Sequence, residues 1–181
     1  MWSNLLTRLM LPIEKKKKKK KKLTRLMFHY WIDKGICVSW SMPPLNWCKV
    51  NSDGSALGNP GRAGGGGLIR NDKGEWIRGY ARAIGCTTSV ADELWALRDG
   101  IRLCIALKLP AVVFELDAKL IVDLLQKEEN HPNCIGTSVS DCKAGLKEIP
   151  MVRIQHCFRE VNKCADALEG ELYSHRTLWC L

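Results

Sequence analysis

The segment NSDGSALGNPG, residues 51–61, is the part of the sequence that decides the fold. It continues a run of mixed apolar and polar residues, and together they predict a β-strand over residues 47–55. Asp53 lies near the end of that strand, and a turn rich in glycine, asparagine and proline follows it. Asp-Gly is also a common turn dipeptide. Turn chemistry alone therefore leaves two interpretations of Asp53 open, a turn residue or a functional carboxylate.

The sequence beyond this segment predicts strands first and then alternating helices and strands. Residues 58–67 are expected to form a turn and a flexible glycine run, and the apolar run 111–117 after Pro110 predicts a buried strand. The expected elements are strands 47–55, 67–70 and 75–83, helix 89–107, strand 111–117, helices 119–127 and 137–149, strand 152–157 and a helix from 162 to about 173. This order predicts an α/β fold with a five-stranded mixed sheet, its first three strands antiparallel, flanked by helices.

Composition restricts the class of protein. The 181 residues are 46% hydrophobic and 26% charged, as in a globular protein with a real core. No run approaches the roughly 18 apolar residues of a membrane span. The nine cysteines include no Cys-x-x-Cys pair, which disfavours a zinc site or a disulfide scaffold. We therefore expect an intracellular, reducing location, nuclear or cytoplasmic, and no membrane partner.

The net positive charge of the chain is confined to its N-terminal part. Residues 1–46 hold 11 Lys/Arg and 2 Asp/Glu, whereas residues 47–181 hold 17 of each. Eight consecutive lysines, 15–22, repel one another and favour a disordered basic arm over 1–46, followed by one domain over 47–181. The arm is compatible with a nuclear-import signal, a polyanion-binding segment, a membrane-surface anchor or a tail without a role.

Three further carboxylates could join Asp53, and each has a structural alternative. Glu93 lies beside the apolar stripe of a predicted helix, where an acidic side chain usually reaches solvent. Asp117 ends a buried strand and could cap the next helix. Asp166 could be a favourable charge near a helix N-terminus. Carboxylates gathered at one point repel each other unless cations lie between them, and hard oxygen ligands suit Mg²⁺.

Four motifs occur in one order: DGSALGNPG from residue 53, ELWAL from residue 93, ELD at 115–117 and NKCADAL from residue 162. Together they resemble ribonuclease H, and more closely the ribonuclease H-like domain of plant non-LTR retrotransposon reverse transcriptases and their stand-alone relatives. The resemblance covers about residues 47–173. It implies an endonuclease that cuts the RNA strand of an RNA–DNA hybrid, leaving 3′-hydroxyl and 5′-phosphate ends. It also implies two Mg²⁺ ions, with Mn²⁺ as an alternative, held by four metal-binding carboxylates: Asp53, Glu93, Asp117 and Asp166.

The resemblance assigns further residues. His156 precedes Asp166 by ten residues, the spacing of a family histidine that assists proton transfer or product release, although a purely structural role stays open. Gly54, Ser55 and Asn59 match the substrate-facing turn. We expect the protein to be a monomer that binds the RNA–DNA hybrid and has no obligate protein partner.

Some residues depart from the family pattern. The acidic stretch 128–132 replaces a basic protrusion, and Asp92 stands where alanine is usual. None of these departures removes a metal ligand, so they bear on substrate affinity rather than on chemistry. Two alternative functions stay open: a catalytically silent nucleic-acid-binding remnant of a retroelement, and a nuclease of different specificity, such as an exonuclease.

Overall fold

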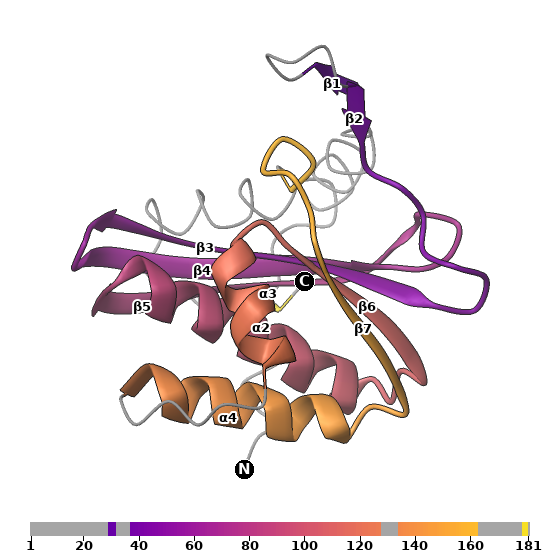
Figure 1. Cartoon of the computed structure of the whole chain (residues 1–181). Coiled ribbons are helices and arrows are strands. Elements are labelled where there is room, and N and C mark those ends of the chain that lie inside the picture. Colours follow the sequence, from indigo (N-terminus) through magenta and orange to yellow (C-terminus); the bar gives the residue numbers. More distant parts are fainter. Residues whose placement is uncertain (1–28, 32–36, 128–133, 163–178, 181) are drawn as a thin grey trace.

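The computed structural model describes residues 29–31, 37–127, 134–162 and 179–180. The elements between residues 48 and 156 follow the predicted order, and three short strands outside that range were not predicted (Figure 1). They are β1 (His29–Trp31), β2 (Cys37–Ser39), β3 (Cys48–Gly58), β4 (Gly61–Arg70), β5 (Trp76–Thr87), α2 (Ser89–Ala106), β6 (Ala111–Leu116), α3 (Lys119–Gln126), α4 (Cys134–Lys147), β7 (Met151–His156) and β8 (Trp179–Cys180). The helix predicted from residue 162 to about 173 lies almost entirely outside the described residues.

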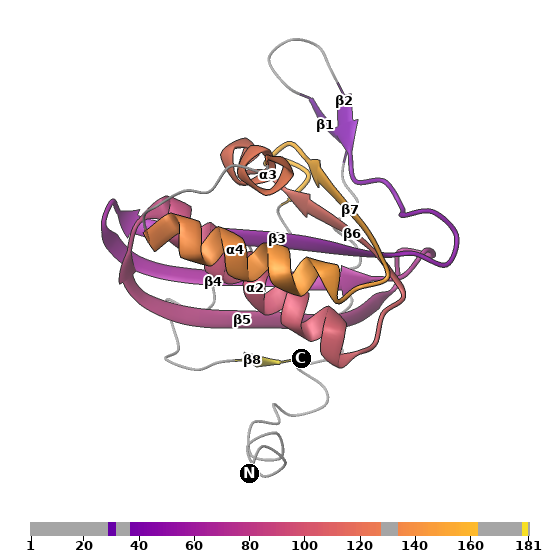
Figure 2. The ribbon, with the colours of Figure 1, turned by 60° about the horizontal axis from the view of Figure 1, so that its bottom comes forward.

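The main sheet has the strand order β7-β6-β3-β4-β5-β8. β3, β4 and β5 pair antiparallel in succession, whereas β3–β6 and β6–β7 are parallel pairs. The predicted five-stranded mixed sheet is therefore confirmed, and the two-residue β8 adds a sixth strand beside β5 (Figure 2). β1 and β2 form a separate two-stranded sheet.

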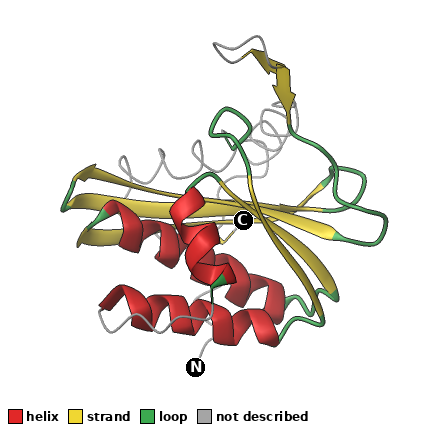
Figure 3. Cartoon of the chain, in the orientation of Figure 1, coloured by secondary structure: helices red, strands yellow, loops and turns green. Residues whose placement is uncertain are grey.

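The described helices all lie on one face of the main sheet (Figures 1 and 3). α2 packs on β3, β4 and β5, and α4 packs on α2. β6 lies between β7 and β3 and is buried at all six positions, which confirms the predicted buried strand. The core between sheet and helices is built from aliphatic and aromatic side chains, which include Val50, Ile69, Leu94, Leu97, Ile101, Val112, Phe114 and Leu116.

The glycine run is a strand, which corrects the prediction of a flexible segment. β4 takes in the whole run and pairs with β3 and β5 along its length. A Cβ at Gly65 would lie 2.8 Å from the Cβ of Ala96, and one at Gly67 would lie 2.4 Å from the Tyr80 hydroxyl. These positions need glycine because neighbouring groups approach the backbone closely. Pairing on both sides and helix packing thus override the low strand propensity of glycine.

Packed residues begin before the predicted domain start at residue 47. Trp40 follows β2, is only 5% exposed and donates a hydrogen bond from Nε1 to Asn51 Oδ1 over 2.9 Å. The division into an arm over 1–46 and a domain from 47 stays a prediction, but the domain's packing includes Trp40. Among the described residues, no helix combines the length and apolar character needed to cross a membrane.

Candidate active site

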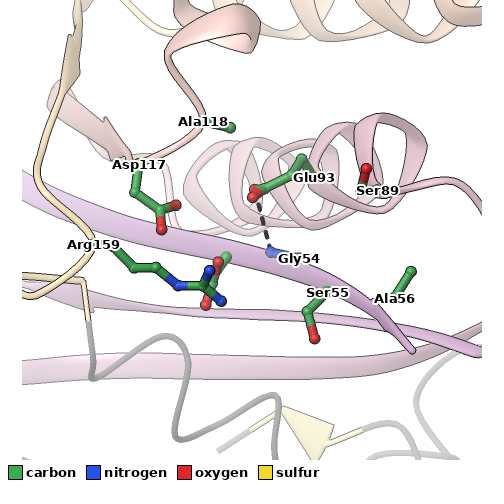
Figure 4. A pocket seen from close by; sticks show the side chains of 9 residues that line it. Gly54, Ser55, Ala56, Ser89, Glu93, Asp117, Ala118 and Arg159 are labelled. Atoms are coloured by element: carbon green, nitrogen blue, oxygen red, sulfur yellow. Dashed lines mark hydrogen bonds between the residues drawn. The ribbon is translucent and has the colours of Figure 1, made fainter. Parts of the chain in front are cut away.

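Three carboxylates meet where β6 ends beside β3. Asp53 belongs to β3, Glu93 to the second turn of α2, and Asp117 directly follows β6. One oxygen from each lies within 4.8 Å of the others. Figure 4 shows Glu93 and Asp117 facing the same pocket. The structure thus brings together three of the four carboxylates predicted to bind metal, and Asp166 lies outside the described residues.

The position of Asp53 differs from the prediction in one respect. β3 does not end near Asp53 but continues to Gly58. The parallel pairing with β6 is what stops, at the pair Ser52 and Leu116. Asp53 therefore comes one residue after the last β3–β6 pair, which places it in the crevice at the carboxyl end of a parallel strand. Such crevices are where open α/β sheets place their functional sites.

Gly54 allows α2 to lie directly on β3. A Cβ at this position would lie 2.5 Å from the carbonyl carbon of Asp92 and 2.5 Å from the backbone nitrogen of Glu93. The Gly54 N–H also donates a hydrogen bond to Glu93 Oε2 over 3.2 Å (Figure 4). The helix and its glutamate are therefore held against the strand that carries Asp53. The predicted role of Gly54 in substrate binding stays a prediction.

The start of α2 is fixed by side chains from two segments. Thr88 is the N-cap, and its hydroxyl accepts a hydrogen bond from the Ala91 N–H over 3.4 Å. Asn59 Oδ1, in the β3–β4 turn, accepts a hydrogen bond from the Ser89 N–H over 3.3 Å. Asn59, predicted to contact substrate, thus joins the turn to the helix and does not line the pocket. Its contact with substrate stays a prediction.

Asn162 holds Asp117 against β3. Its side chain is buried, and Nδ2 donates to the Ser52 carbonyl over 2.8 Å and to Asp117 Oδ1 over 3.3 Å. Asn162 has no role predicted from the sequence, although it stands four residues before Asp166 in the NKCADAL motif. Its place in that motif was the available signal, because no local pattern reveals a hydrogen-bond partner, Ser52, that lies 110 residues away in the sequence.

The pocket has a volume of about 380 Å³ and opens beside the carboxylates. Arg159, from the segment after β7, extends its guanidinium group into it (Figure 4). Arg159 stands in no helical or strand pattern, and the sequence alone did not indicate it as a site residue. The lining residues are Asp53, Gly54, Ser55, Ala56, Ser89, Glu93, Asp117, Ala118 and Arg159.

The negative charges of the three carboxylates repel one another. Burial raises the pKa of Glu93 well above its ordinary value, and the charges of Asp53 and Asp117 raise it further. Burial also raises the pKa of Asp117, against the opposing effect of the Arg159 guanidinium. Such a group favours a cation between its members. Three carboxylates in an open pocket, with room for water and phosphate oxygens, fit Mg²⁺ or a similar hard divalent ion.

His156 lies at the end of β7, beside the carboxylates but not in the pocket lining. Its Nε2 is 3.1 Å from the Asp117 carbonyl oxygen. A carbonyl only accepts hydrogen bonds, so this contact requires the proton on Nε2. The exposed ring also meets Phe158 edge-on, with 6.0 Å between ring centroids. The predicted part of His156 in proton transfer or product release stays a prediction.

The sequence is similar to those of known proteins. A family model described as "Reverse transcriptase-like" matches residues 51–169. The "Putative ribonuclease H protein" of Arabidopsis thaliana is 35% identical over 139 residues, which is 76% of this chain and 22% of that protein. The present chain thus spans about a fifth of the length of that curated relative.

Solved structures share the fold. The ribonuclease H1 of Halobacterium salinarum superposes with a TM-score of 0.67 at 22% identity, over 71% of this chain and 98% of that one. A ribonuclease H1 isolated from compost by a metagenomic approach, solved in complex with an RNA/DNA hybrid, gives 0.63 at 28% identity, over 68% of this chain and 94% of its own.

Proposed function

The chain belongs to the reverse transcriptase-like family and has the ribonuclease H fold, and we propose that it hydrolyses the RNA strand of RNA–DNA hybrids with the help of Mg²⁺. The observation that carries this proposal is the convergence of Asp53, Glu93 and Asp117 within 4.8 Å at an open pocket. The compost ribonuclease H1, which was solved with an RNA/DNA hybrid bound, supports the substrate class.

The three carboxylates would hold the metal, with Asp166 as the fourth expected ligand and Mn²⁺ as an alternative ion. Two bound divalent ions would polarise the scissile phosphodiester and make a water molecule more acidic. The protein's own part is to hold the ligands. Gly54 fixes Glu93 through its N–H, and Asn162 fixes Asp117 through its side-chain amide.

Arg159 is placed to hold the substrate rather than the metal. Its guanidinium group shares the pocket with the carboxylates (Figure 4). A guanidinium group binds phosphate through two parallel hydrogen bonds, which fixes orientation as well as charge. Arg159 would therefore orient the phosphodiester against the carboxylates. Ser55 also lines the pocket, and its hydroxyl is suited to a ribose 2′-hydroxyl, the group that distinguishes RNA from DNA.

Cleavage of a labelled hybrid by the full-length protein, with Mg²⁺ and with EDTA, tests the proposal. The Asp53→Asn variant removes one ligand charge while it keeps the side-chain volume. Asp123→Asn is the matched control, because Asp123 is a half-exposed carboxylate on α3 paired with Lys119. We expect Mg²⁺-dependent cleavage by the wild type and by Asp123→Asn, and a loss of at least about 100-fold in Asp53→Asn.

The choice of substrates separates the alternatives. Duplex DNA, duplex RNA and both single strands are offered beside the hybrid. A wild type that binds the hybrid but never cleaves it is the silent remnant, and its binding should then weaken steeply with salt. Stepwise release of single nucleotides from one end would identify an exonuclease. Equal cleavage by Asp53→Asn and the wild type would remove Asp53 from the site.

A further inference from the structure

A buried polar cluster lies on the face of the main sheet opposite the helices. Along β3 and β6 it comes just before the carboxylates Asp53 and Asp117. Successive side chains of a strand point to opposite faces. Val50 and Phe114 pack in the core under the helices, so their neighbours along β3 and β6 face the other way. We call the following four residues, each at most 5% exposed, the inner polar cluster: Trp40, Lys49, Asn51 and Glu115.

Glu115 is the centre of this cluster. Its Oε1 accepts hydrogen bonds from Lys49 Nζ over 2.6 Å and from Gln155 Nε2, at the edge of the cluster, over 2.7 Å. Its Oε2 accepts from Asn51 Nδ2 over 3.0 Å. Trp40 Nε1 in turn donates to Asn51 Oδ1 over 2.9 Å. Both carboxylate oxygens are therefore occupied, and Asn51 is held from both ends of its amide.

The Asn51–Glu115 hydrogen bond joins β3 to β6 at one defined register. The two residues are direct partners in the parallel pairing. Asp53 and Asp117 follow two residues later on the same strands, so they belong to the same face. Two residues of strand span about 6.6 Å. A slip of the register by two residues would separate the carboxylates by about that much, more than the 4.8 Å that now contains them.

A one-residue slip is already excluded by the core, because it would turn the apolar side chains of β6 to the wrong face. A two-residue slip keeps the alternation of apolar side chains on the helix face, so that alternation alone does not exclude it. Directional hydrogen bonds discriminate strongly. The inner polar cluster supplies such bonds at the pair Asn51 and Glu115, two residues before the carboxylates along both strands.

We propose that Asn51 and Glu115 are positioning residues, whose cross-strand hydrogen bond sets the separation of Asp53 and Asp117 and so the affinity of the site for Mg²⁺. This inference rests on the proposed metal-dependent function. Lys49 and Trp40 act indirectly, because Lys49 donates a hydrogen bond to Glu115 and Trp40 donates one to Asn51. Groups that hydrogen-bond metal ligands directly typically contribute 10- to 100-fold to metal affinity. Asn51 and Glu115 act through the strands that carry the ligands, so we expect an effect at the lower end of that range.

Isothermal titration of the full-length protein with Mg²⁺, without substrate, tests the inference directly. Asn51→Ala removes the cross-strand bond, and we expect its Kd for Mg²⁺ to rise at least about 10-fold. Val50→Ala is the matched control: Val50 is the neighbouring residue of β3, fully buried, with its side chain on the helix face. It should lower the melting temperature and leave the Kd within about twofold of the wild type.

The outcomes are distinct. An Asn51→Ala Kd within about twofold of the wild type overturns the inference, and so does an equal loss of affinity in both variants. If Asn51→Ala does not fold, Trp40→Phe removes the indole donor to Asn51 and keeps an aromatic ring beside Lys49 and Arg70. An unchanged Kd in that variant also overturns the inference. A wild type that neither binds Mg²⁺ nor cleaves the hybrid refutes the proposed function, and the inference falls with it.

Discussion

Replacing Gly54 by alanine would test whether the close packing of α2 on β3 places Glu93. The added Cβ would lie 2.5 Å from the Asp92 carbonyl carbon, 2.5 Å from the Glu93 nitrogen and 2.7 Å from the Asp92 oxygen. Non-bonded carbon atoms settle about 3.5–4.0 Å apart. All three atoms belong to the backbone, so no side chain can rotate away. The first turns of α2 must therefore move away from the sheet by about 1 Å.

That displacement is large compared with the positional tolerance of a catalytic site, but its cost in folding stability is only moderate. Catalytic groups have to be held within about 0.5 Å of the productive geometry. A misplacement of about 1 Å can cost about 100-fold in rate, whereas overpacking of this kind typically costs about 1–3 kcal/mol of stability. We expect Gly54→Ala to remain folded and to cleave the hybrid about 100-fold more slowly at saturating Mg²⁺.

Single-turnover cleavage rates and melting curves of the same preparations separate the two effects. Gly145→Ala is the matched control, because its Cβ would lie 2.8 Å from Ile101 Cγ2, at the contact of α4 with the C-terminal half of α2. It should lower the melting temperature and leave the rate within about threefold of the wild type. A Gly54→Ala rate within that range, or an equal loss of rate in both variants, would refute the reasoning.

Two further predictions concern the supports of the site. Asn162→Ala removes the hydrogen bonds to Ser52 and Asp117, and should raise the Mg²⁺ concentration for half-maximal cleavage about 10-fold; an unchanged titration would contradict this. A chain that starts at residue 47 loses Trp40 and the Ser41 carbonyl that accepts from Lys49 Nζ. Urea unfolding should show it about 2–4 kcal/mol less stable than a chain that starts at residue 37, and equal values would contradict that expectation.

The sequence predicted those parts of the fold that have a local pattern. The apolar run after Pro110 indicated β6, and apolar spacing indicated α2, whose first residue Ser89 was predicted correctly. The three described carboxylates could be found because their motifs occur in a fixed order. Their convergence follows from the topology, which places the end of β6 beside β3 and lays α2 across that strand.

Other parts depend on contacts between distant segments and had no local signal. Glycine favours turns, so the run in β4 looked flexible, whereas Gly65 and Gly67 are required by the close approach of Ala96 and Tyr80. Arg159 follows β7 outside any periodic pattern, and only the fold shows that it reaches the pocket. Tertiary packing therefore decided these features against, or without, local propensity.

The inner polar cluster fixes the positions of the carboxylates, and it does so at some cost in folding stability. A buried ion pair such as Lys49–Glu115 carries a desolvation cost, and a well-packed apolar pair is often as stable or more so. Apolar contacts are not directional, however, and a slip of β3 along β6 by two residues would keep apolar side chains on the same face. The cluster also controls charge: Lys49 neutralises Glu115, which stands only two residues behind Asp117 on the same face. Without Lys49, Glu115 would add another negative charge to a group in which burial and repulsion already raise the pKa of Glu93. A lysine, an amide and a carboxylate together thus supply a fixed register without further repulsion, which neither an apolar pair nor a lone carboxylate could do.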